Sequence, residues 1–366
     1  MTLVNTWLLL LITMSMTFYC SSSRALGGDP LVPGMFVFGD SLVDNGNNNF
    51  LNSIAKSNYI PYGIDFNGVP TGRFCNGKTM VDMLGEMLGL PYIPAYADPT
   101  TAGAKILGGV NYASAAAGIL EETGQHYGER YSLNQQVLNF EGTLYQLRTQ
   151  MSARNLTQCL AKSIAVMVFG SNDYINNYLL PSLYPTSHKY NPVEFANLLL
   201  NHYTRQILAL YNVGLRKFLL AGIGPLGCIP NQLATGEAPP GSCVSYANEI
   251  LEKFNVGLRS VVNQLNSNHT GAIFVYGNTY GAMVDILNNA TAYGFYVIDR
   301  GCCGLGRNQA QMTCLPLSIP CPNRNQFIFW DAFHPTQAVN TILSQRAFSG
   351  PPSDCYPINI QQMAQI

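Results

Sequence analysis

Five short apolar runs, separated by stretches with helical periodicity, constrain the fold of this chain more than any other feature. They cover residues 35–39, 109–113, 163–169, 217–222 and 272–276. Most of the runs are continuous rather than alternating, which is typical of strands that are covered on both faces. Helical periodicity recurs between them, as over 193–211 and 244–265. Because strands that alternate with helices pair in parallel, the pattern predicts an α/β fold with one parallel sheet and helices on both faces.

Nothing in the sequence divides the chain into several domains. Its 366 residues contain neither an internal repeat nor a long linker, and 47% hydrophobic residues are enough for a sizeable core. The Pro- and Gly-rich stretch 238–241 lies between Cys228 and Cys243 and is typical of a loop tip. We therefore predict a single domain over 26–366, preceded by a removable segment at 1–25.

The first 25 residues have the pattern of a secretory signal peptide. An uncharged, largely apolar segment runs from Trp7 to Tyr19 and is followed by the small residues 20–23 and Ala25. The segment is shorter than the roughly 20 residues of a bilayer span, whereas its length and the small residues after it fit a cleaved signal. No Lys or Arg precedes it, so a buried N-terminal helix is the alternative interpretation. We predict cleavage near residue 25, secretion, and no stable membrane span.

Glycosylation motifs indicate the same compartment. Sequons begin at Asn155, Asn268 and Asn289. A secreted chain can carry glycans at such sites when they lie in exposed loops or at helix ends. These three asparagines are therefore candidate N-glycosylation sites.

Cysteine usage also favours an oxidising compartment. Six of the ten cysteines cluster in loop-like sequence: Cys228, Cys243, Cys302, Cys303, Cys314 and Cys321. We interpret them as local disulfide staples, and the sequence leaves their pairing open. A zinc site is not expected, because Cys302 and Cys303 are adjacent and the group contains neither a C-x-x-C pair nor a histidine. If Cys20 leaves with the signal, the remaining odd number leaves at least one thiol unpaired, with Cys75 and Cys159 as candidates.

The low charge of the chain excludes whole classes of partner. Charged residues make up 11% of the sequence, against roughly 25% in soluble domains, and the formal net charge is -1. A nucleic-acid surface needs clustered Lys and Arg, which 19 scattered basic residues do not supply. We expect no nucleic-acid partner and no electrostatic docking onto anionic membranes.

A serine closely follows the first apolar run. Ser41 stands two residues after that run ends, and in an open parallel sheet this position lies at the carboxyl edge, where ligands bind. Its hydroxyl is therefore expected where a nucleophile is needed. The alternative is a helix N-cap, a role that Asp40 and Asp44 could also fill.

An aspartate and a histidine stand three residues apart after the apolar stretch 327–330. On a tight turn, this spacing lets the Asp331 carboxylate accept a hydrogen bond from Nδ1 of His334 while Nε2 stays available, which is the orienting half of a Ser-His-Asp triad. The alternative is that Asp331 caps a helix that starts near Pro335.

Two further strand ends carry hydrogen-bond donors at the same edge of the sheet. Asn172 could aim an amide N–H at a developing oxyanion, a contact whose loss typically costs about 10²- to 10³-fold in rate; an Asx turn is the alternative. The turn 110–118 is rich in small residues whose backbone N–H groups a substrate could approach, and a tight packing corner is the alternative. A nucleophile, a backbone donor, an amide donor and an acid–base pair at one edge together predict a hydrolase site.

These motifs resemble the SGNH, or GDSL-type, esterases and lipases, and in particular their secreted plant branch. Residues 36–49, with Gly-Asp-Ser-Leu at 39–42, resemble the first block of that family, and 70–74 is similar to a further signature of the plant branch. Residues 109–118, 170–174 and 330–335 resemble the second, third and fifth blocks. The resemblance spans nearly all of the mature chain.

The resemblance implies a three-layer α/β/α sandwich of the flavodoxin-like SGNH type, with a five-stranded parallel sheet. It also implies hydrolysis of small-molecule or lipid carboxylic esters in the extracellular space (cell wall or apoplast), through an acyl-enzyme and without a metal or other cofactor. Ser41 would be the nucleophile, His334 the general base and later acid, and Asp331 the carboxylate that orients His334.

The oxyanion hole that the resemblance implies combines the N–H of Ser41, the side chain of Asn172 and one N–H of the second block. Glycines are frequent in that block, but this chain has alanine at 115–117. We assign the second-block donor to Gly118, while an alanine N–H could serve equally unless the turn demands positive φ.

Other functions fit the sequence less well or remain open. The chain has no G-x-S-x-G elbow of an α/β-hydrolase and no H-E-x-x-H metal motif. An acyltransferase, in which a hydroxyl replaces water, would use the same residues. A non-catalytic secreted lipid- or glycan-binding glycoprotein is the alternative from another class, and intact Ser41, Asn172, Asp331 and His334 count against it. Acyl chain length and leaving group cannot be read from the sequence.

Overall fold

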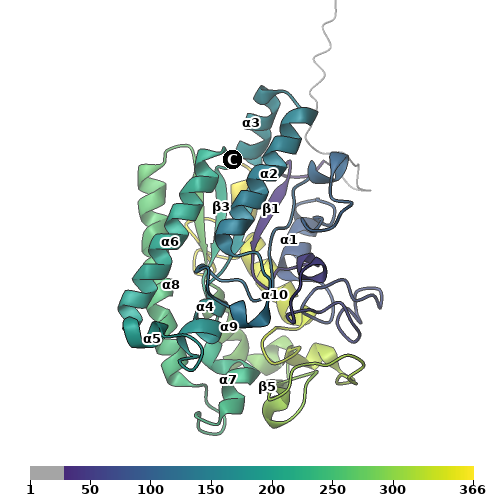
Figure 1. Cartoon of the computed structure of the whole chain (residues 1–366), viewed down its shortest axis with the longest axis vertical. Helices are drawn as coiled ribbons and strands as arrows, with labels where there is room; N and C mark the ends of the chain where they lie inside the picture. Colours follow the sequence, from purple (N-terminus) through teal and green to yellow (C-terminus); the bar gives the residue numbers. More distant parts are fainter. Residues whose placement is uncertain (1–28) are drawn as a thin grey trace, which may run out of the picture.

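The computed structural model describes residues 29–366 (Figure 1), so the signal peptide predicted at 1–25 lies outside the described residues. The central sheet has five strands in the order β1-β2-β3-β4-β7. The first four are parallel neighbours: β1 (Met35–Gly39), β2 (Ile164–Val168), β3 (Lys217–Ala221) and β4 (Ile273–Gly277). Four of the five predicted strands are therefore confirmed, within a residue or two of their expected bounds.

The fifth predicted strand, at 109–113, is not a regular strand. The segment runs beside β1, where the N–H of Val37 donates to the carbonyl of Val110 at 3.1 Å, but its strand-like pairing is limited to single bridges at Asn111. Gly109 has a φ of +111°, which interrupts the extended backbone. The fifth strand of the sheet is instead β7 (Cys355–Tyr356), which is antiparallel to β4 and too short to give a sequence pattern.

Helices cover both faces of the sheet, as expected for three layers. One face carries α2 (Leu133–Gln150), α3 (Ala153–Lys162), α6 (Pro192–Asn212) and α8 (Ser245–Asn268). The other carries α1 (Met80–Met87), α10 (Gln337–Ser349) and α11 (Ile360–Ala364). Figure 1 shows α6 and α8 to the left of the sheet and α1 to its right. Alternation along β1 supplies both cores, since Phe36 and Phe38 belong to the first and Met35 and Val37 to the second.

Local sequence signals explain where the main helices begin. Asn191 caps α6, its side chain accepts from the N–H groups of Val193 and Glu194, and Pro192 occupies the first turn. Thr79 and Asp82 form a reciprocal capping box at the start of α1. The remaining short helices are α4 (Ser171–Asp173), α5 (Thr186–Lys189), α7 (Pro230–Thr235) and α9 (Thr279–Asn288).

A second, two-stranded parallel sheet lies beyond the carboxyl edge of the main sheet. It pairs β5 (Val297–Gly301) with β6 (Phe327–Phe329). The loop between them is the yellow-green segment at the lower right of Figure 1. Strand β6 ends two residues before Asp331, so this small sheet places Asp331 and His334.

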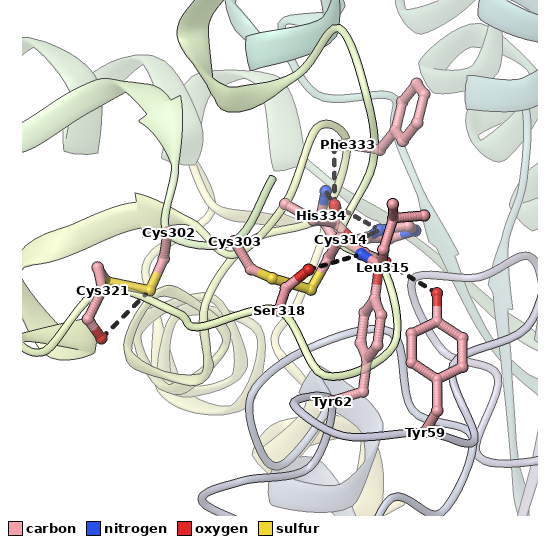
Figure 2. The surroundings of a disulfide bond; sticks show 11 residues. Tyr59, Tyr62, Cys302, Cys303, Cys314, Leu315, Ser318, Cys321, Phe333 and His334 are labelled. Atoms are coloured by element: carbon pink, nitrogen blue, oxygen red, sulfur yellow. Dashed lines mark hydrogen bonds and ion pairs between the residues drawn. A yellow bond between two sulfur atoms is a disulfide. The ribbon is translucent and has the colours of Figure 1, made fainter. Parts of the chain in front are cut away.

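Disulfide staples join the cysteines that the sequence singled out. The pairs are Cys228–Cys243, Cys302–Cys321 and Cys303–Cys314. Figure 2 shows the last two side by side in the loop between β5 and β6. Cys75, one of the two candidates for an unpaired thiol, is free and buried, and so is Cys355. The expectation for the other candidate was wrong, since Cys159 is disulfide-bonded.

The candidate glycosylation sites lie at helix ends. Asn268 and Asn289 are exposed at the ends of α8 and α9, and Asn155 is half-buried in the first turn of α3. Glycan attachment at these positions stays a prediction. No helix within 29–366 combines the length and apolarity needed to cross a bilayer.

Candidate active site

The turn after β1 presents Ser41 at the carboxyl edge of the sheet. A side chain at Gly39 would collide with that of Val43, so the strand can end this tightly only with glycine there. The side-chain amide of Gln136 makes two hydrogen bonds to the backbone of Gly39, accepting from its N–H at 2.9 Å and donating to its carbonyl at 2.8 Å. Asp40 accepts from the N–H of Leu42 at 3.0 Å. Ser41 is left half-buried at the tip of a rigid turn.

The polar run after Ser41 ties this turn to the second sequence block. Asp44 accepts from the N–H of Asn47 at 2.8 Å and from that of Ala115 at 3.1 Å. Asn48 accepts from Ser114 Oγ at 2.6 Å and from the N–H of Ala115 at 3.0 Å. Burial, only partly offset by these bonds, raises the pKa of Asp44 to about 6. Buried side chains thus join the two segments that border the site.

The turn after β6 brings Asp331 and His334 together, as their spacing predicts. Oδ1 of Asp331 accepts from the N–H groups of Phe333 and His334 at 2.9 and 2.8 Å, and from Nδ1 of His334 at 2.8 Å. Nε2 of His334 lies 2.7 Å from Oγ of Ser41. We assign the imidazole proton to Nδ1, because its partner is a carboxylate and the partner of Nε2 is a hydroxyl that can donate.

Asp331 is fully buried and ionised. Burial raises the pKa of its carboxyl group, but the nearby charge of His334 and hydrogen bonds from His334, Tyr62 and the Phe333 backbone outweigh burial and leave that pKa below its usual value. An ionised carboxylate is the form that can hold the Nδ1–H of His334 in place.

Asn172 lies at the same edge, after β2. Its Nδ2 donates to the carbonyl of Ala117 at 2.9 Å, and its Oδ1 accepts from Nδ2 of Asn176 at 2.7 Å. These two bonds fix which end of the amide is nitrogen. Nδ2 carries a second N–H that the Ala117 carbonyl does not use, and Asn172 lines the cavity beside Ser41.

The structure does not bring Gly118 to the cavity. Ala115 and Ala116 line it instead, and Ala116 has a φ of +64°. A side chain at Gly118 would collide with Thr123 and approach Asp173 Oδ1 to 2.6 Å, so close packing accounts for this glycine. The turn does demand positive φ, but at Ala116 and not at a glycine, so the donor role of Gly118 stays a prediction that the cavity lining does not support.

A cavity of about 370 Å³ opens onto Ser41, Asn172 and His334. This volume is near the lower end of the range for small-molecule sites. Its walls are largely apolar: Ile54, Tyr59, Phe169, Ile175, Leu226, Ile229, Met283, Phe333 and Leu343. Among residues 29–366 no group of three His, Cys, Asp or Glu side chains is arranged to hold a metal ion.

Two residues of the site were missed by the sequence reasoning. The hydroxyl of Tyr62 donates to Oδ2 of Asp331 at 2.6 Å across 269 residues of chain, and no local motif signals such a contact. Asn176, which orients Asn172, lies four residues after it, a spacing at which side chains meet within a helical turn.

A hydrogen-bonded serine, histidine and aspartate at the carboxyl edge of a parallel sheet is the arrangement of a serine hydrolase. The family model of the GDSL-like lipases/acylhydrolases matches residues 35–347. The chain belongs to this family, and with it to the carboxylic ester hydrolases.

Similar proteins from Arabidopsis thaliana support the same assignment. GDSL esterase/lipase At1g71250 is 60% identical over 354 residues, which cover 97% of this chain and 95% of the relative. GDSL esterase/lipase At5g08460 is 59% identical, with 92% of this chain and 88% of the relative covered. GDSL esterase/lipase At1g71691 is 51% identical, with 93% and 87% covered. The likeness therefore extends over whole chains.

Proposed function

We propose that the protein is a secreted serine esterase that hydrolyses carboxylic esters through an acyl-enzyme on Ser41. The observation that carries this proposal is the unbroken series Asp331–His334–Ser41, with hydrogen bonds of 2.8 and 2.7 Å, at the mouth of an apolar cavity. The cavity offers the acyl chain an apolar environment while its ester carbonyl lies beside Ser41. The related Arabidopsis proteins are named esterase/lipase, in agreement with this proposal.

Acylation begins with proton transfer from Ser41 to Nε2 of His334. Oγ attacks the ester carbonyl as the proton leaves, and the Asp331 carboxylate stabilises the imidazolium that forms. His334 then gives the proton to the leaving alkoxide, so the C–O bond of the ester breaks as the leaving alcohol departs. Water repeats the sequence on the acyl-enzyme, releasing the acid and restoring the Ser41 hydroxyl.

The negative charge on the attacked oxygen needs hydrogen-bond donors in place before reaction. We assign them to the backbone N–H groups of Ser41 and Ala116 and to the second N–H of Asn172 Nδ2. Ala116 replaces Gly118 in this role because it lines the cavity in the left-handed conformation and Gly118 does not line it. Asn176 holds the Asn172 amide in the donating orientation.

Secretion is the second part of the proposal. Three disulfides lie within the described chain, and such bonds persist in oxidising compartments. Two of the three sequons are exposed. Together with the apolar segment at 7–19 and the small residues after it, these features support export to the extracellular space, with removal of 1–25.

Hydrolysis of graded acyl esters, from acetyl to long-chain, tests the proposal. We expect the purified secreted protein to turn over at least part of the series, and Ser41→Ala to lose roughly 10³-fold or more in kcat. An unchanged circular dichroism spectrum of Ser41→Ala would show that the fold is kept. Undiminished activity of that variant would contradict the proposal. If neither protein hydrolyses any ester but the wild type transfers the acyl group to an added alcohol, the protein is an acyltransferase instead.

A further inference from the structure

We propose that Tyr62 is a positioning residue of the active site, whose hydroxyl fixes the Asp331 carboxylate and sets the negative charge that it presents to His334. This inference rests on the proposed function of Ser41, His334 and Asp331. Tyr62 does not bond to His334 or Ser41 in the structure, so it would act through Asp331 alone.

The carboxylate of Asp331 has a different set of partners on each oxygen. Oδ1 takes the backbone N–H groups of Phe333 and His334 together with Nδ1 of His334, all from its own turn. Oδ2 lies 2.9 Å from the same Nδ1 and accepts from the hydroxyl of Tyr62 at 2.6 Å. Tyr62 is therefore the partner from outside the turn that holds Oδ2, and removing its hydroxyl would free one side of the carboxylate.

Aromatic packing holds the ring of Tyr62 in place. It contacts Trp330, Phe74 and Tyr59 edge-on, with centroid distances of 6.0, 6.1 and 5.3 Å. It is only 2% exposed and shares a buried cluster with Trp330 and the Cys303–Cys314 disulfide. Figure 2 shows Tyr62 and Tyr59 next to this disulfide, close to His334. The hydroxyl has little freedom to turn away from Asp331.

Tyr62 stays protonated and so remains a donor. Burial, and then the charge of Asp331, raise the pKa of its hydroxyl well above the usual range of tyrosine. Other titratable groups also face this part of the site. Tyr59 and Cys75 interact with the charge of Asp331, and Asp40 interacts with that of His334. Burial raises the pKa values of Tyr59 and Cys75 to about 12, so both stay neutral, and that of Asp40 to about 7.

The direction of the effect follows from the donor. A hydrogen bond from Tyr62 withdraws negative charge from Asp331 and so weakens its support for a protonated His334. Without the hydroxyl, the carboxylate stabilises the imidazolium more strongly. The acidic limb of kcat/KM against pH then moves upward, and kcat falls because the carboxylate holds the imidazole less firmly.

Tyr62→Phe, compared with Tyr178→Phe, tests this assignment. Tyr178 is also buried and loses the same atom, but its hydroxyl donates to the Tyr190 carbonyl at 2.9 Å and it does not line the cavity. With a soluble acetyl ester, we expect Tyr62→Phe to lower kcat roughly 10- to 100-fold, by analogy with residues that orient the ligands of a catalytic metal. KM should stay nearly constant and the acidic limb should rise by about half a pH unit or more. Tyr178→Phe should stay within about twofold of wild type at every pH.

A second readout keeps the test independent of activity. In a Ser41→Ala background, the proton NMR resonance of His334 Nδ1–H reports its hydrogen bond to Asp331 directly, and we expect Tyr62→Phe to shift it while Tyr178→Phe does not. Equal behaviour of the two variants in both readouts would overturn the role of Tyr62. Full activity of Ser41→Ala would overturn the proposed function instead, so the two failures can be told apart.

Discussion

Two turns meet at the bond between Ser41 and His334, and they are held by different forces. The turn after β1 that carries Ser41, the nucleophile turn, is fixed by buried amides and carboxylates, in particular Gln136, Asp44 and Asn48. The turn after β6 that carries Asp331 and His334, the acid–base turn, is fixed by an aromatic cluster around Trp330. The loop with two disulfides also holds it, because the N–H of Cys303 donates to the carbonyl of Trp330 at 2.7 Å. The first turn therefore depends on buried hydrogen bonds and on close packing at Gly39, while the second also depends on the oxidised state of the cysteines beside it.

The largest effect is expected from Asp331→Asn. The amide keeps the shape of the side chain but cannot accept from Nδ1 of His334 as the carboxylate does, and we expect kcat to fall by about 10⁴-fold with little change in fold. Steady-state kinetics beside a circular dichroism spectrum measure both. A loss of less than about tenfold would show that the acid–base turn contributes much less than the nucleophile turn.

Disulfide removal separates stability from positioning. Replacing the cysteines of Cys303–Cys314 or of Cys228–Cys243 by serine opens loops with sequence separations of 11 and 15 residues, so each change should lower the free energy of unfolding by roughly 3 kcal/mol. A cysteine of the first pair itself bonds to the residue before Asp331, whereas the second pair reaches the acid–base turn only through Asn231, three residues after Cys228. Assayed well below the unfolding temperature, removal of the first pair alone should lower kcat, by about tenfold. Equal losses of activity in both variants would refute a special role for the loop between β5 and β6.

Two buried aspartates of these turns, Asp40 and Asp331, should respond to pH in opposite ways. Burial raises the pKa of Asp40 to about 7, and its Oδ2 has no partner among the described residues, whereas the pKa of Asp331 is lowered. The folded protein thus keeps a proton on Asp40 up to about pH 7, whereas the unfolded chain releases it near pH 4. Protonation of Asp40 therefore favours the folded state at low pH, and this contribution to the free energy of unfolding is lost as the pH rises. Asp40→Asn should reduce the loss of unfolding free energy between low and high pH, by at most about 4 kcal/mol. Urea unfolding at about pH 4.5 and 8 measures it, and a parallel decline in both proteins would contradict the assignment.

The smallest effect is expected from Ala116→Gly. Glycine adopts the φ of +64° without strain, but it also loses more conformational entropy on folding, so the free energy of unfolding should change by less than about 1 kcal/mol. Activity should stay within about threefold, since the backbone N–H is retained. A large loss would show that the methyl group of Ala116 itself contacts the substrate.

The same contrast explains what the sequence could and could not predict. Ser41, Asp331, His334 and Asn172 follow strand ends, and the topology of parallel strands brings such positions to one edge, so local patterns were enough. Tyr62 reaches Asp331 from 269 residues away, a contact that only the folded chain reveals. The positive φ at Ala116 was missed because residue type suggests such a conformation only at glycine.

The sheet shows the same limit. The continuous apolar runs predicted β1 to β4, whose strands are covered on both faces. The run at 109–113 is equally apolar and hydrogen-bonds to β1, but it forms only single bridges beside the positive φ of Gly109. The two-residue β7 takes the fifth place in the sheet through contact with β4. Edge positions are decided by tertiary contacts that periodicity does not record.

The central claim is that Ser41 carries the acyl group during turnover. Mass spectrometry of the protein, quenched with acid while it hydrolyses a short-chain ester, tests this most directly. Our account predicts a mass increase equal to one acyl group on the peptide that contains Ser41, absent from Ser41→Ala and from wild-type protein kept without ester. Continued hydrolysis with the acyl group found on another residue would contradict it.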